Sequence, residues 1–121
     1  MKLKNILIVV SDIEKSKEFY RDLFGLQVIR DFGQNVMLTE GLVLQEKKSW
    51  EQLVEKEAVC GGYDAELYFE ESDMDSFLAK LNAYECEVKS LNACMTNAYG
   101  QRVIRIYDPD DHVIEIKEVT S

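Results

Sequence analysis

One local pattern occurs twice in the sequence, and this repeat limits the folds that the chain can adopt. The apolar run Ile6–Val10 ends at Ser11-Asp12 and precedes a segment with helical periodicity. A second strand-like run ends at Ser72-Asp73, and Asp73 lies 61 residues after Asp12. Runs of β-branched residues are typical of strands, and Ser or Asp is a common N-cap before an apolar helix. The pattern predicts a tandem repeat of one α+β unit.

The first copy is predicted to be a β-α-β-β-β unit. After Asp12, apolar and small residues fall on one helical face, and Gly25 is a C-terminal stop. That face consists of Ile13, Ser16, Phe19, Tyr20, Leu23 and Phe24. Three short strands are expected next, over residues 26–32, 35–40 and 41–47.

The second copy repeats this order. We expect a strand over 65–73, a helix over 74–84, and strands over 86–92, 101–108 and 112–118. The last two are joined by "DPDDH", a Pro/Asp turn. We interpret residues 1–121 as one domain: module one over 1–47, a connector over 48–62 whose middle forms a short helix, and module two over 63–121.

Composition excludes several classes of partner. The net charge is −9 for 121 residues, which argues against nucleic acid and anionic membranes as partners. The N-terminal apolar run is too short for a signal peptide, so we expect a cytoplasmic protein. The three cysteines lack a Cys-x-x-Cys spacing, which argues against a disulfide scaffold or a thiolate metal site.

Two motifs resemble the vicinal oxygen chelate superfamily, which includes glyoxalase I, bleomycin and fosfomycin resistance proteins and extradiol dioxygenases. "ILIVVSDIEKSKEFYRDLFGL" is similar to the opening strand and helix of that superfamily, and "GQRVIRIYDPDDHVIEIKE" to its closing hairpin. The resemblance implies an α+β fold of two β-α-β-β-β modules whose mixed sheets form a U-shaped cleft. It also implies a homodimer.

The resemblance further implies four metal-ligand positions. The first-strand positions fall on Asn5 and Glu66, and the last-strand positions on Gln45 and Glu115, with Glu46 replacing Gln45 if the register slips by one. Family enzymes usually place histidine at one or more of these positions, and this chain places none. An all-oxygen set suits Mg²⁺ or Mn²⁺ better than Zn²⁺; Ni²⁺ is a further candidate, and we favour a site without metal.

The cleft of the resemblance also needs walls that hold a small molecule. Candidate cleft residues are Phe32, Trp50, Tyr63, Tyr68, Tyr99 and Arg102. Strand alternation puts Tyr68 on the same face as Glu66, and puts Arg102 and Arg105 on opposite faces. Either arginine is a candidate to bind an anionic ligand or to pair with a cleft glutamate.

Two functions follow from these residues. The first is a small-molecule-binding protein of the glyoxalase/bleomycin resistance type with degenerate metal positions. The alternative is a divalent-metal-dependent lyase or isomerase of the glyoxalase I type, with Glu115 and Glu66 as ligand and catalytic base. Iron dioxygenase chemistry is excluded because it normally requires two histidine ligands. A purely structural or regulatory module ranks last.

Overall fold

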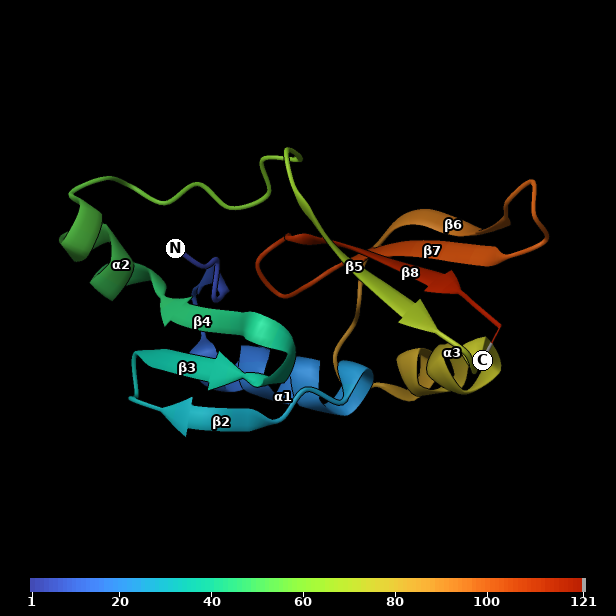
Figure 1. Cartoon of the computed structure of the whole chain (residues 1–121), viewed down its shortest axis with the longest axis horizontal. Helices are drawn as coiled ribbons and strands as arrows, with labels where there is room; N and C mark the ends of the chain where they lie inside the picture. The colour runs from blue at the N-terminus through green and yellow to red at the C-terminus, as the bar shows by residue number, and fades with distance from the viewer. Residues whose placement is uncertain (121) are drawn as a thin grey trace. The chain divides into compact units, whose positions relative to one another are not determined.

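A computed structural model of the chain describes residues 1–120 (Figure 1). The chain divides into two compact units, Met1–Cys60 and a second that begins at Gly61. The elements of the first unit are β1 (Ile6–Val10), α1 (Ile13–Phe24), β2 (Val28–Asp31), β3 (Asn35–Leu38), the 3₁₀ turn η1 (Thr39–Gly41), β4 (Leu42–Glu46) and α2 (Lys47–Val54). Those of the second are β5 (Glu66–Glu71), α3 (Met74–Ala83), β6 (Ser90–Thr96), β7 (Arg102–Tyr107) and β8 (Val113–Glu118).

Each unit contains one four-stranded mixed sheet, and the two sheets have the same topology. The strand order is β1-β4-β3-β2 in the first unit and β5-β8-β7-β6 in the second. The first and last strands of each unit are parallel, and the other neighbours are antiparallel. The predicted α+β fold of two β-α-β-β-β modules is therefore confirmed.

Helix α1 covers one face of the first sheet. Asp12 caps it by accepting a hydrogen bond from the backbone N–H of Lys15, and Gly25 ends it in the left-handed conformation with φ 69°. The buried residues of α1 are Ser16, Phe19, Tyr20 and Leu23, four of the six predicted for this face; Ile13 and Phe24 are half-buried. The helix contacts β4, so these side chains form the core of the unit with the buried strand residues.

Four isoleucines form the buried face of the second sheet. Ile104 and Ile106 of β7 lie opposite Ile116 and Ile114 of β8, and all four are buried. Alternation places Arg102 and Glu118 on this same face.

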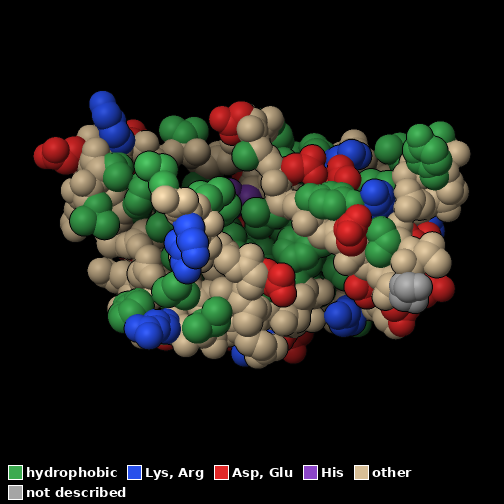
Figure 2. All heavy atoms as spheres, viewed as in Figure 1, with side chains coloured by type: hydrophobic (Ala, Val, Ile, Leu, Met, Phe, Trp, Pro, Cys, Tyr) green, Lys and Arg blue, Asp and Glu red, His purple; other side chains and the backbone are tan. Residues whose placement is uncertain are grey.

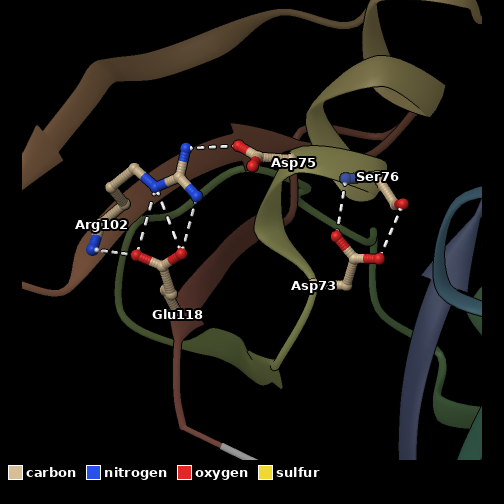
Figure 3. A network of polar contacts seen from close by, with 5 residues as sticks. All are labelled: Asp73, Asp75, Ser76, Arg102 and Glu118. Carbon is tan, nitrogen blue, oxygen red and sulfur yellow. Dashed lines mark hydrogen bonds and ion pairs between the residues drawn. The ribbon is translucent and has the colours of Figure 1, made fainter.

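Arg102 binds Glu118 through Nε and Nη2, and its Nη1 lies 2.8 Å from Asp75 in the first turn of α3 (Figure 3). The ion pairs therefore tie the helix to this face of the sheet.

Two sequence-based boundaries need correction. The second strand of module two was expected over 86–92, but β6 begins at Ser90 and continues to Thr96. Its pairing with β7 and a turn centred on Asn97 determine this position, because Asn97 Oδ1 accepts hydrogen bonds from two backbone N–H groups of the turn. The connector helix begins earlier than expected, at Lys47, because Glu46 caps it. Within residues 1–120, the helices are all too short or too polar to span a membrane.

Candidate ligand-binding site

The face of the second sheet opposite the isoleucines carries most of the candidate site. Alternation along β5, β8 and β7 brings Glu66, Tyr68, Glu115 and Arg105 to this face. Tyr68 lies opposite Glu115, and Glu115 lies opposite Arg105, so the three residues form one row across three strands. We call this side of the sheet the open face. Over the strands of the second unit, acidic, basic and apolar side chains lie next to one another on the surface in view (Figure 2).

An ion pair occupies the middle of the open face. Arg105 Nη2 lies 2.6 Å from Glu115 Oε1, and the two side chains are 31% and 15% exposed. At this burial the pair is screened less by solvent than a surface ion pair. Glu115 is therefore held in place by a protein cation.

Glu66 is the second carboxylate of this region. It lies two residues before Tyr68 on β5, opposite Val113. Burial of the carboxyl group raises the pKa of Glu66, and so do the charge of Glu115 and a hydrogen bond with it; the charge of Arg105 opposes this shift. The like charge of Glu115 is therefore part of the environment that disfavours the charged form of Glu66.

A second polar cluster lies beside this row. The Tyr68 hydroxyl donates to Glu70 Oε2 at 2.8 Å, and Lys117 Nζ lies 5.5 Å from the centre of the Tyr68 ring. Lys117 is also 3.9 Å from Glu70. These contacts orient the Tyr68 ring, which is 47% exposed and so available to a ligand.

A pocket of about 450 Å³ opens next to Glu66. Its lining comes from the segment before β5, from β5 itself and from β6, β7 and β8: Tyr63, Asp64, Ala65, Glu66, Leu91, Arg105 and Val113. The volume is within the range of small-molecule sites, roughly 300–1,000 Å³. The pocket therefore joins the ion-paired row of the open face to an aromatic and apolar wall.

Two tyrosines stiffen this wall. The Tyr107 hydroxyl donates to the Tyr63 hydroxyl at 3.2 Å, and the rings meet edge to face with centroids 6.1 Å apart. The hydrogen bond with Tyr63 raises the pKa of Tyr107 to about 12, so the Tyr107 phenol is neutral at physiological pH.

The metal-ligand positions predicted in the first unit have different surroundings from those in the second unit. Asn5 is exposed and lies just before β1. Gln45 is 6% exposed and uses both ends of its amide: it accepts from Asn35 Nδ2 at 2.7 Å and donates to Ser49 Oγ at 2.6 Å. Glu46 instead accepts from the backbone N–H of Ser49 as the cap of α2.

The strand register also separates Gln45 from Glu115. Glu115 lies opposite Tyr68, and the residue 61 positions before Tyr68 is Leu7. Leu7 lies opposite Val43. The structural counterpart of Glu115 is therefore Val43, and Gln45 lies two residues further along the same face.

The predicted metal donors are poorly suited to a divalent metal, because two of them already bind other side chains. Gln45 is hydrogen-bonded at both amide atoms, and Glu115 is ion-paired with Arg105. Among residues 1–120, no three His, Cys, Asp or Glu side chains converge in a metal-binding arrangement. A Mg²⁺, Mn²⁺, Ni²⁺ or Zn²⁺ site needs more ligands than one free carboxylate. The donors of the second unit do not fit a resident metal.

The other predicted cleft residues lie on several different elements. Phe32 and Tyr99 are 66% and 88% exposed, in the β2–β3 and β6–β7 connections, and Trp50 lies on α2 of the first unit. Arg102 is on the buried face, bound to Glu118 and Asp75 (Figure 3). Of the six candidate cleft residues, Tyr68 lies on the open face with Glu115, and Tyr63 lines the pocket beside Glu66.

Several residues at the pocket were not predicted from the sequence. Asp64, Leu91 and Val113 of the lining were not singled out, nor was Tyr107, which is hydrogen-bonded to Tyr63 of the lining; Arg105 was a candidate for either an anionic ligand or a cleft glutamate. Alternation gave a partial signal, because Tyr107 follows Arg105 by two residues and Val113 precedes Glu115 by two. The pairing of β7 with β8 places Arg105 opposite Glu115 and Tyr107 opposite Val113. Without this pairing, the four residues could not be recognised as neighbours.

Comparisons with known proteins agree with this architecture. A family model described as a glyoxalase-like domain matches residues 3–121. No curated protein sequence matches the chain significantly.

Solved structures match over nearly the whole chain. A protein of unknown function from Agrobacterium tumefaciens str. C58 is 34% identical, with a TM-score of 0.83 over 98% of this chain and 94% of that one. The fosfomycin resistance protein FosX of Listeria monocytogenes is 20% identical, with a TM-score of 0.74 over 100% and 93% of the two chains. A lactoylglutathione lyase from Agrobacterium tumefaciens is 21% identical, with a TM-score of 0.71 over 97% and 92%. The last two likenesses concern the fold alone.

Proposed function

Because this chain belongs to the glyoxalase-like domain family of the vicinal oxygen chelate superfamily, we propose that it binds a small organic molecule on the open face of its second sheet. Binding takes place without a resident metal. The ligand contacts Tyr68 and the pocket beside Glu66, while Glu115 stays paired with Arg105.

The Arg105–Glu115 ion pair is the observation that carries this proposal. A glutamate that serves as a metal ligand or catalytic base needs a free carboxylate, and this one is bound at 2.6 Å by a guanidinium. A paired carboxylate beside a pocket lined by Tyr63, whose ring packs against Tyr107, is instead suited to orienting a ligand. The ordered polar row supplies specificity, and the pocket supplies apolar contact.

The metal-dependent lyase is the weaker candidate for the same reason. It would require Glu115 to leave Arg105 and Gln45 to give up its bonds with Asn35 and Ser49. Losing partners of buried polar groups is unfavourable. No catalytic step is therefore assigned to Glu115 or Gln45.

A fragment screen by ¹H–¹⁵N NMR tests the proposal. We expect hits that shift the amides of β5, β7 and β8 next to the open face, and Tyr68→Ala should weaken them roughly tenfold, equivalent to about 1.4 kcal/mol. Tyr99→Ala is the matched control, because Tyr99 is also an exposed tyrosine of the second unit. If fragments cluster instead around Tyr99 or on the first unit, the site is elsewhere.

Adding metals separates the two functions. Thermal melts with Mg²⁺, Mn²⁺, Ni²⁺ or Zn²⁺ added singly should leave Tm unchanged, in the wild type and in Glu115→Gln. A rise with one metal that Glu115→Gln removes would favour the lyase, and hemithioacetal substrates would then be tested.

Three further proposals concern the setting of this function. We propose that the two units act as one domain and that the chain forms a homodimer, which light scattering after size exclusion tests. We also propose a cytoplasmic location. The sequence supports it, since three cysteines without a Cys-x-x-Cys spacing do not resemble the disulfide frameworks of oxidising compartments.

A further inference from the structure

We infer that the pocket beside Glu66 selects an organic cation, namely an ammonium group attached to an apolar or aromatic body. This inference rests on the proposed function, because it names the ligand class of the same site. The charges of the lining residues and the exposed tyrosine ring both support this ligand class.

The charge balance of the pocket is the first argument. Asp64 and Glu66 supply two carboxylates, and Arg105 supplies the only basic group of the lining. Arg105 is already bound to Glu115 at 2.6 Å, so its charge is neutralised within the protein. An anionic ligand would have to displace Glu115 and approach two carboxylates. A cation would meet those carboxylates without breaking the ion pair.

The relation between Glu66 and Glu115 is the second argument. The two carboxyl groups repel each other when both are charged, and the repulsion adds to the effect of burial on Glu66. A positive group beside Glu66 would favour its charged form. A cation in the pocket would also offset the repulsion between the two carboxylates.

The tyrosine wall is the third argument. Tyr63 is 68% exposed, and its hydroxyl is held by Tyr107, so the ring is both available and oriented. The face of a tyrosine ring attracts cations. Leu91 and Val113 provide apolar surface next to it, which fits the body of an amphipathic cation.

Three probes of similar size test the ligand class on the full chain: benzyltrimethylammonium, benzyl alcohol and benzoate. The first carries a permanent positive charge, the second is neutral and the third is an anion. We expect benzyltrimethylammonium to shift the amides of residues 62–66, Leu91 and Arg105, and to bind roughly tenfold more tightly than the other two probes.

Single substitutions identify the groups responsible. Asp64→Asn and Glu66→Gln should each weaken the binding of benzyltrimethylammonium several-fold. Glu18→Gln is the matched control, because it removes one negative charge from an exposed position on α1 of the first unit. Tyr63→Phe should keep the affinity, and Tyr63→Ala should lower it. Retained amide dispersion in the NMR spectra verifies that each variant is folded.

The outcomes separate this inference from the proposed function. If benzoate or benzyl alcohol binds the same residues as tightly as the cation, the inference fails and the binding site stands. If Glu18→Gln weakens binding as much as Glu66→Gln, net charge and not the pocket is responsible, and the inference also fails. If no fragment of any charge shifts the open face, the proposed function itself is wrong.

Discussion

Arg105 and Glu115 face each other on β7 and β8, and their side chains are joined by an ion pair of 2.6 Å. This pair connects the strand register to the chemistry of the open face. Arg105 binds Glu115, the residue predicted at a metal-ligand position of the superfamily. The pair lies beside a second carboxylate, Glu66. Four predictions on stability follow from this pair and from other contacts in the structure.

Removing Arg105 should destabilise the second unit. Arg105→Gln leaves Glu115 beside Glu66 without its guanidinium partner, and a half-buried carboxylate that loses its cation is unfavourable. We expect a double-mutant cycle with Glu115→Gln, followed by urea unfolding, to give a coupling free energy of about 1 kcal/mol. Arg30→Gln is the control, since Arg30 is an exposed arginine of β2. A coupling near zero would mean that the ion pair is absent in solution.

Breaking the Arg102 contacts should lower stability without affecting ligand binding. Arg102→Gln removes the bonds to Glu118 and Asp75 on the buried face, so Tm should fall, and fall further than in Asp75→Asn, which removes one bond. Hydrogen bonds from Arg102 lower the pKa of Glu118. The stabilisation by Glu118 is therefore present above the ordinary carboxyl pKa and is lost as pH falls. Altered fragment affinity in Arg102→Gln would contradict the assignment of faces.

The single histidine gives the opposite pH dependence. Burial lowers the pKa of His112, but the hydrogen bond to Asp108 and the charges of Asp108, Asp110 and Asp111 outweigh it, so the pKa is raised above 6.5. Its stabilisation is complete below pH 6.5 and is lost as pH rises through the folded pKa. Urea unfolding from pH 5.5 to 8.5 should show this decline in the wild type and not in His112→Asn. A histidine NMR titration with a midpoint below 6.5 would refute it.

Two glycines with similar backbone conformations should differ in their tolerance of alanine. Gly61 has φ 78°, and a Cβ there would lie 3.1 Å from Asp111 Cβ. Gly100 has φ 76° with nothing within 4 Å. Gly100→Ala should cost about 1 kcal/mol for the left-handed conformation alone, and Gly61→Ala should cost more because of the added contact. Equal losses in denaturant unfolding would mean that the segment before β5 does not lie against the β7–β8 turn.

The sequence alone determined the architecture of each unit. Helix starts at Asp12 and Asp73, the stop at Gly25 and the alternation of β7 and β8 are local features, and local propensities and caps act within a few residues. The repeat of these features then identified two similar units, since the same short-range pattern has the same structural solution twice. Even the opposite orientation of Arg102 and Arg105 followed from period two.

Only the tertiary structure decided which side chains meet. The pairing of β7 with β8 joined Arg105 to Glu115, and the position of β6 depended on its hairpin with β7. Gln45 became a buried, fully bonded residue because Asn35 lies opposite it and α2 begins just after it. Strand register and helix docking depend on contacts between residues distant in sequence, where a shift of one position changes the face of every side chain.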